Sequence, residues 1–79
     1  SKGAIAKIIE QISGKDLIKL LGKVGFQPVR QSGSHVRLMH ADGRRTSVPV
    51  HSHDNVHQGL LKSILKDINI TPEQYLSLK

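Results

Sequence analysis

The sequence predicts a small α+β domain: a helix, a three-stranded antiparallel sheet and a second helix, followed by a short C-terminal helix. Apolar residues recur at helical spacing on both sides of the middle of the chain. Between them, apolar and polar residues alternate in short runs separated by turn-forming residues, as in a β-meander. A chain of 79 residues has room for one such domain.

The N-terminal segment, residues 1–12, is interpreted as an extension of this domain, which would span residues 13–79. Isoleucines in the extension follow the i, i+3, i+4, i+7 spacing of one helix face, so a short helix is expected there. These isoleucines are Ile5, Ile8, Ile9 and Ile12.

The first helix of the domain is predicted over residues 14–24. Ser13 is a suitable N-cap residue, with Asp16 at the position where a capping box usually has Glu. Gly25 suits the left-handed position that follows a helix. An apolar stripe on this helix would face the core. It consists of Leu17, Leu20, Leu21 and Val24.

The middle of the chain predicts three strands. They are residues 26–30, 34–40 and 45–50. Pro28 and Pro49 cannot donate a hydrogen bond to a neighbouring strand, so each is expected in an edge strand or at a bulge. The Gln-Ser-Gly stretch turns the chain after the first strand, and Asp42-Gly43 predicts a hairpin after the second.

The C-terminal third predicts a polar loop and two helices. The loop covers residues 51–59 and the longer helix residues 60–68. Thr71 is a suitable N-cap for the short final helix, with Pro72 at its first position. The apolar face of the longer helix consists of Leu60, Leu61, Ile64, Leu65 and Ile68.

The composition narrows the classes of function. There are 12 Lys and Arg against 6 Asp and Glu, a formal charge of +6 that attracts polyanions, so RNA, DNA and an acidic protein are all candidate partners. One Tyr, one Phe and no Trp argue against recognition by stacking bases on aromatic side chains. The absence of Cys excludes disulfides and thiolate zinc sites. No run approaches the roughly 18 apolar residues of a membrane span, so we expect a cytoplasmic protein without a membrane partner.

The stretch QSGSHVRLMH, residues 31–40, contains the candidate catalytic group. Strand alternation turns Val36 and Leu38 towards the helices and leaves His35 and Arg37 on the open face of the sheet. Arg45 from the third strand shares that face, so an imidazole that can transfer a proton lies among guanidinium groups that can bind phosphate. The alternative is an exposed histidine without a catalytic role.

Three further residues are candidates for binding RNA. Gly33 allows a close approach of a phosphate or sugar to the backbone, and Ser34 offers a hydroxyl and an N–H group. Lys15 lies at the start of a helix, where N–H groups favour anions. The alternatives are an ordinary turn for Gly33-Ser34 and a solvated surface charge for Lys15.

The stretch HSHDNVH contains three histidines, His51, His53 and His57, and raises the question of a metal site. Imidazoles so close together can bind zinc adventitiously, but the chain offers no further ligand set for a metallohydrolase. A solvated loop, or contact with RNA or a partner protein, is the interpretation we favour. We expect no metal and no small-molecule cofactor.

Five short motifs occur in order along residues 13–71: Ser-Gly-Lys, Gly-Phe, Gly-Ser-His, Val-Pro-Val-His and Gly-x-Leu-x-x-Ile-Leu. This ordered set resembles the HicA family of bacterial toxins, also called YcfA-like. The resemblance implies a double-stranded-RNA-binding-domain-like α-β-β-β-α fold, ribosome-independent cleavage of mRNA and inhibition by a HicB-type antitoxin. It also implies that His35 is the active histidine. Val36 stands where the family often has a second histidine, and Gln58-Gly59 where it usually has Pro-Gly.

The leading hypothesis is therefore a toxin of a toxin–antitoxin pair that acts as a metal-independent endoribonuclease. One alternative is a module that binds double-stranded RNA by its shape without cutting it. Another is an inactive relative whose basic face binds RNA or an acidic partner protein.

Overall fold

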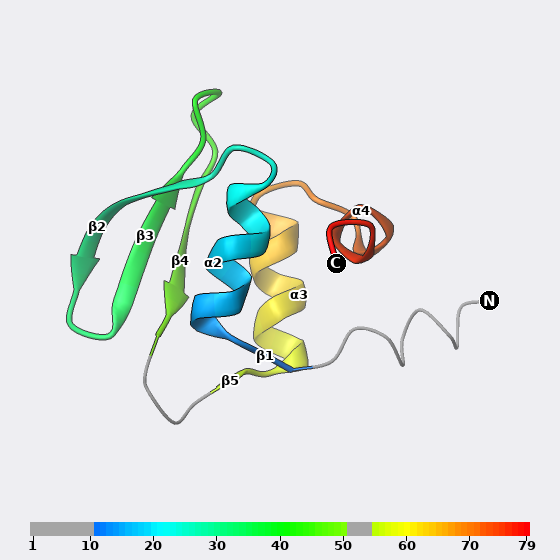
Figure 1. Ribbon diagram of the computed structural model, residues 1–79, viewed down its shortest axis with the longest axis horizontal. Coiled ribbons are helices and arrows are strands. Elements are labelled where there is room, and N and C mark those ends of the chain that lie inside the picture. Colours follow the sequence, from blue (N-terminus) through cyan, green and yellow to red (C-terminus); the bar gives the residue numbers. More distant parts are fainter. Residues whose placement is uncertain (1–10, 51–54) are drawn as a thin grey trace.

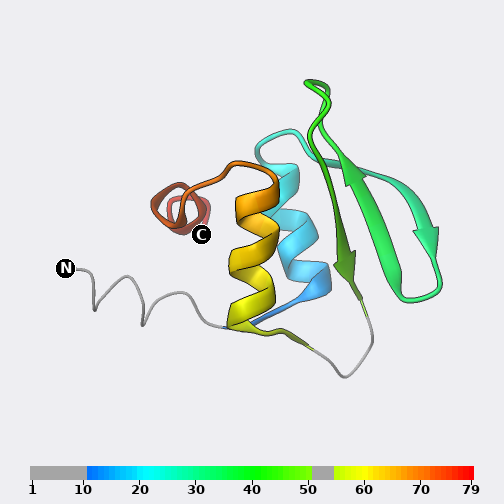
Figure 2. The ribbon, with the colours of Figure 1, turned by 180° about the vertical axis from the view of Figure 1, so that it is seen from behind.

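The computed structural model describes residues 11–50 and 55–79. Two helices, α2 (Gly14–Gly22) and α3 (Gln58–Asp67), lie side by side against one face of a three-stranded sheet (Figure 1). Viewed from behind, the same two helices separate the sheet from the short helix α4 (Pro72–Leu76), and no helix of the described residues covers the other face of the sheet (Figure 2). The predicted α+β class and the α-β-β-β-α order are confirmed.

The sheet consists of β2 (Gln27–Ser32), β3 (His35–Met39) and β4 (Arg45–Pro49), antiparallel, with β3 in the centre. Pro28 and Pro49 therefore lie in edge strands, as predicted, and the register between β2 and β3 shifts between Pro28 and Arg30. This bulge gives β2 one extra residue between Pro28 and Arg30. Strict alternation continued through that residue would assign side chains to the wrong face of the sheet.

The turn between β2 and β3 is shorter than predicted. The strand was expected to end at Arg30, but it continues to Ser32, which pairs directly with His35. Only Gly33 and Ser34 connect the two strands. Gly33 has a φ of 60°, the positive value that the first position of a type II′ hairpin turn requires.

The predicted hairpin at Asp42-Gly43 is present as a three-residue loop. The N–H of His40 donates to the carbonyl of Arg44 (2.8 Å), and the N–H of Gly43 donates to the carbonyl of His40 (2.9 Å). Gly43 has a φ of 97°, which a side chain would strain. This is the turn-and-bulge geometry common for hairpin loops of this length.

Helix α2 has the predicted N-cap, Ser13, and the predicted left-handed glycine after its end, Gly25. The Ser13 hydroxyl accepts a hydrogen bond from the N–H of Asp16 (3.1 Å). At the other end the N–H of Phe26 donates to the carbonyl of Leu21 (3.1 Å), and Gly25 has a φ of 101°. These are the features of a Schellman motif, which ends the helix at Gly22 rather than at residue 24.

The start of α2 lies directly on the end of β4. A β-carbon added to Gly14 would overlap the carbonyl of Pro49, so only glycine fits at this contact. The neighbouring residue, Val50, donates its N–H to the carbonyl of Ser34 (2.7 Å). The beginning of α2, the end of β4 and the β2–β3 turn are thereby held together.

The prediction of a loop over residues 51–59 is wrong for its second half. Asn55–Val56 form a short strand, β5, which pairs antiparallel with β1 (Ile12–Ser13). Val56 is fully buried, and α3 begins at Gln58 instead of residue 60. The single apolar Val56 among polar neighbours gives no local strand pattern, because its burial depends on a partner far away in the sequence.

The N-terminal prediction is only partly within the described residues. Ile12, the last isoleucine of the predicted short helix, lies in β1, pairs with Val56 and packs against the core. The other three isoleucines lie outside the described residues, and so do His51 and His53.

The core is formed by apolar side chains from α2, α3, α4, β5 and the inner face of the sheet. Its buried members are Leu17, Leu21, Phe26, Val36, Leu38, Val48, Val56, Leu61, Ile64, Leu65, Ile68, Ile70 and Tyr75. A capping box between Thr71 and Gln74 fixes the start of α4, whose Tyr75 is completely buried. Burial raises the pKa of the Tyr75 phenol, because the charged phenolate is poorly solvated there.

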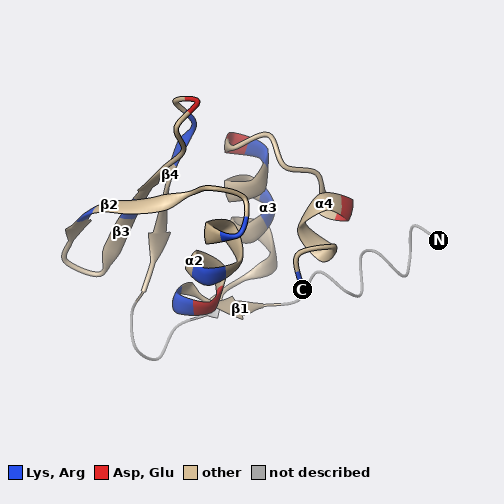
Figure 3. Ribbon diagram, turned by 45° about the horizontal axis from the view of Figure 1, so that its top comes forward, with Lys and Arg blue, Asp and Glu red and all other residues tan. Residues whose placement is uncertain are grey.

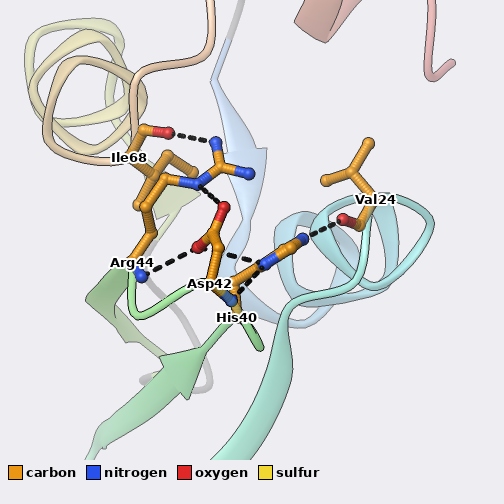
Figure 4. Close-up of polar contacts among 5 residues, drawn as sticks. All are labelled: Val24, His40, Asp42, Arg44 and Ile68. Atoms are coloured by element: carbon orange, nitrogen blue, oxygen red, sulfur yellow. Dashed lines mark hydrogen bonds and ion pairs between the residues drawn. The ribbon is translucent and has the colours of Figure 1, made fainter.

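Three residues of the β3–β4 hairpin, His40, Asp42 and Arg44, form a hydrogen-bonded group that we call the hairpin clasp (Figure 4). His40 Nε2 donates to the carbonyl of Val24 (2.9 Å), and Arg44 Nη1 donates to the carbonyl of Ile68 (2.7 Å). Arg44 Nε also donates to Asp42 Oδ2 (2.8 Å). The clasp therefore ties the hairpin to the ends of both long helices.

The charges within the clasp favour ionised Asp42. The backbone N–H of Arg44 donates to Asp42 Oδ1 (3.0 Å), and this bond, followed by the Arg44 guanidinium and His40, holds the pKa of the carboxyl below its ordinary value. Arg44 also lies over the ring of Phe26, with its guanidinium carbon 5.2 Å from the ring centroid. Every polar member of the clasp thus has a partner.

Candidate active site

The open face of the sheet contains the predicted catalytic histidine. Along β3, Val36 and Leu38 are 8% and 0% exposed, whereas His35 and Arg37 are exposed on the opposite face. The orientation predicted from strand alternation is therefore correct for both pairs.

A depression of about 310 Å³ surrounds His35 on this face. All three strands contribute to it, because Ser32 and Arg30 of β2 pair with His35 and Arg37, and Ser47 of β4 pairs with Arg37. Among the described residues, one imidazole, two guanidinium groups and two hydroxyls thus line one hollow in the sheet. This set can bind an anion and exchange a proton with it.

A second depression of about 210 Å³ adjoins the first. It is lined by Arg37, Arg45, Thr46 and Ser47. Arg37 and Ser47 belong to both hollows, so the two lie next to each other along the strands. Arg45, predicted to join the site of His35, lies instead in this neighbouring depression.

The strands that form both depressions are positively charged throughout. Residues 27–32, 35–39 and 45–49 include three arginines and a histidine but no Asp or Glu. The described acidic residues lie on the helices and in the β3–β4 loop (Figure 3). They are Asp16, Asp42, Asp67 and Glu73. Within residues 11–50 and 55–79, no ion pair involves an arginine of these strands.

Arg30 and Arg37 are direct cross-strand partners. Like charges in that position repel each other and destabilise a sheet. Such a pair is compatible with folding because both side chains are exposed to water, and a bound anion would relieve the repulsion. The electrostatics of this face therefore favour a phosphate or another anion.

The remaining predicted site residues lie outside both depressions. Gly33 and Ser34 form the turn immediately before His35, and a β-carbon added to Gly33 would meet no atom within 4 Å. The backbone at Gly33 is thus accessible to a ligand. Lys15 is exposed in the first turn of α2, on the other side of the sheet. Lys15 does not line either depression.

Sequence reasoning missed Arg30 and Ser32, which line the depression with His35. The predicted first strand ended at Arg30, and Pro28 disrupted its alternation. A usable signal was the turn: if only Gly33 and Ser34 connect the strands, Ser32 must pair with His35. Counting back from a two-residue turn would have placed both residues on the open face.

Of the three histidines in the histidine-rich stretch, only His57 lies within the described residues. No group of three or more His, Cys, Asp or Glu side chains there could hold a metal ion. His57 instead caps α3, since its Nδ1 accepts a hydrogen bond from the N–H of Leu60 (3.2 Å).

Comparison with known proteins decides the family. The family model described as HicA toxin of bacterial toxin-antitoxin matches residues 14–70, a range that covers α2, the whole sheet and α3. The chain belongs to the HicA toxin family. As a HicA toxin it is one component of a toxin–antitoxin system, and membership implies an antitoxin partner and an RNA target. A search of the curated proteins found no match.

Both depressions of this HicA toxin lie within the matched range, as does the Gly-Ser-His motif that carried the resemblance. No helix of the described residues is long and apolar enough to cross a membrane.

Proposed function

We propose that this HicA toxin is a metal-independent endoribonuclease that cleaves mRNA in the cytoplasm, with His35 as its catalytic residue. One observation carries the proposal: His35 lines a depression together with Arg30 and Arg37. A proton-transfer group thus lies beside two cations, on a face with no carboxylate in its strands. Family membership supports RNA as the target.

The reaction that suits this set of groups is attack by a ribose 2′-hydroxyl on the adjacent phosphorus. The new bond joins the 2′-oxygen to phosphorus, and the bond from phosphorus to the 5′-oxygen breaks. The products are a 2′,3′-cyclic phosphate and a 5′-hydroxyl end. The reaction needs a base for the 2′-hydroxyl proton, an acid for the leaving oxygen, and positive charge near the phosphate oxygens.

His35 supplies one of the two proton transfers. Among the described side chains that line the depression it is the one imidazole, and water is the group to which we assign the other transfer. Arg30 and Arg37 stabilise the charge that develops on the phosphate, because a guanidinium can donate two parallel hydrogen bonds to its oxygens. Ser32 and Ser47 add hydroxyl donors to the same hollow.

Further contacts with RNA and the antitoxin complete the proposal. Gly33 and Ser34 contact the backbone of the RNA at the His35 end of the sheet, and Lys15 contacts a more distant part of a long substrate. The positive open face is also the surface that an acidic HicB-type antitoxin would cover, and covering it would exclude RNA.

The test compares wild type, His35→Ala and a matched histidine variant, His57→Asn, on a labelled single-stranded mRNA in EDTA. Asn is a good N-cap residue, so His57→Asn removes an imidazole outside the depression and keeps the cap of α3. Wild type and His57→Asn should cleave equally well. His35→Ala should cleave at least about a hundredfold more slowly, the usual loss for a proton-transfer group. Circular dichroism should show that all three proteins are folded.

Undiminished cleavage by folded His35→Ala would overturn the assignment of the catalytic residue. Loss of wild-type cleavage in EDTA, restored by added zinc, would overturn the metal-independent mechanism. If wild type binds RNA and cleaves none, the protein is a binding module and the enzymatic proposal fails.

A further inference from the structure

Two adjacent depressions on one face suggest more than a single phosphate site. The first contains His35, and the second contains Arg45 and, among the described residues, no histidine. If proton transfer takes place in the first depression, the second depression has no part in it. Its lining, with the guanidinium groups of Arg37 and Arg45 and the hydroxyl of Ser47, nevertheless suits an anion.

The spacing of the two hollows fits a polymer of phosphates. His35 and Arg37 lie on the same face of β3, two positions apart. Arg45 pairs with Met39, which lies two further positions along β3. Each such step of two positions is about 7 Å along the strand. This is comparable to the distance between consecutive phosphates of an extended sugar–phosphate backbone.

The second depression is also held in place by the fold. Arg45 directly follows Arg44, whose guanidinium donates to the carbonyl of Ile68 in the clasp. Arg45 also pairs with Met39 at the end of the β3–β4 ladder. The backbone that presents Arg45 is therefore fixed before any ligand binds. A site that is preorganised in this way loses less entropy on binding.

We propose that the second depression binds the phosphate next to the scissile one, so that a single RNA strand runs along β3 across the open face. Arg45 holds that neighbouring phosphate, and Arg37, shared by both hollows, lies between the two. This inference rests on the proposed function, because it takes the His35 depression as the site of cleavage. It defines the substrate as a strand with a phosphate on at least one side of the cleaved linkage.

The test uses a short oligonucleotide whose sequence comes from a site that wild type cuts in a long RNA. It is made of deoxynucleotides with one ribonucleotide, so that only one linkage can be cleaved. One neutral methylphosphonate replaces the phosphate on the 5′ side, the phosphate on the 3′ side or, as a control, a phosphate three linkages away. The four proteins are wild type, Arg45→Ala, Arg45→Lys and Lys62→Ala. Lys62 is exposed on α3, so its variant removes the same charge elsewhere.

With wild type, one of the two neighbouring methylphosphonates should lower kcat/KM about tenfold, the loss of a charge-assisted hydrogen bond. The distant methylphosphonate should have no such effect. Arg45→Ala should lose a similar factor on the unmodified substrate and should then be insensitive to the same methylphosphonate. Arg45→Lys should recover part of the loss, and Lys62→Ala should behave as wild type.

The inference is overturned if Arg45→Ala responds to both neighbouring methylphosphonates as wild type does. It is also overturned if neither of them slows wild type. Both results leave cleavage of the unmodified substrate, and with it the proposed function, intact. Failure of wild type to cut the long RNA would overturn the proposed function itself and the assignment of both depressions.

Discussion

The β3–β4 hairpin contains two regions that each combine a histidine with an arginine, and they differ in every other respect. In the hairpin clasp, His40 and Arg44 donate to the carbonyls of Val24 and Ile68. On the open face, the side chains of His35 and Arg37 form no hydrogen bond or ion pair within the described residues.

The difference shows which polar residues this small fold needs for its own stability. Partnered groups such as those of the clasp stabilise the fold, because removing one leaves a carbonyl or carboxylate without its bond. Exposed cations that face each other without a carboxylate contribute nothing to stability and slightly oppose folding. Residues of the second kind are the ones whose presence a ligand best explains.

The largest contrast is expected between the two histidines. Removal of His35 should reduce RNA cleavage at least about a hundredfold and leave the melting temperature unchanged. The His40→Ala variant should lose about 1–3 kcal/mol of unfolding free energy, since the Val24 carbonyl loses its donor and Phe26 its ring contact. Urea unfolding followed by circular dichroism measures the second effect. A His40→Ala protein as stable as wild type would contradict the structural role of the clasp.

Arg44 of the clasp and Arg37 of the open face should show the same contrast between stability and RNA binding, with smaller effects. Arg44→Ala should lose about 1–3 kcal/mol of stability and leave the salt dependence of RNA binding unchanged, because its guanidinium bonds Asp42 and Ile68 rather than phosphate. Arg37→Ala should keep its stability, bind RNA more weakly and reduce the salt dependence of binding, with a slope of log K against log [salt] lower by about 1. This slope can be measured by fluorescence anisotropy of labelled RNA. The proteins compared are His35→Ala, which does not cleave the RNA, and the double variant that also carries Arg37→Ala. An unchanged slope would remove Arg37 from the phosphate contacts.

The smallest effect concerns pH and Asp42. Folding lowers the pKa of this carboxyl below the ordinary 3.8, so its ionised form stabilises the fold above that pH. The contribution is lost as the pH falls through the lowered pKa. The difference in melting temperature between wild type and Asp42→Asn should therefore be largest near neutral pH and shrink in acid. A difference independent of pH would show that the charge of Asp42 does not stabilise the hairpin.

The elements that sequence reasoning predicted correctly depend on neighbours close in the chain. The caps at Ser13 and Thr71, the glycine turns at Gly25 and Gly43, and the outward orientation of His35 all follow from patterns within a few residues. Turn chemistry, capping and side-chain alternation are local properties, so the sequence alone contains them.

Most of the errors and omissions involve residues whose partners lie on another helix or strand. Val56 forms a strand because Ile12 lies opposite it. Arg30 lies on the same face as His35 because the turn at Gly33 and Ser34 pairs Ser32 with His35 and Arg30 with Arg37. The partners of His40 and Arg44 lie on other elements, beyond any local pattern.

The sequence by itself therefore determined the α+β order, the family and the face on which His35 lies. Only the tertiary structure decided that Arg30 and Ser32 share its depression and that Arg45 occupies the next one. The physical reason is that strand register is set jointly by bulges, turn length and burial of one face. A one-residue change in any of these would move a side chain from the open face to the core.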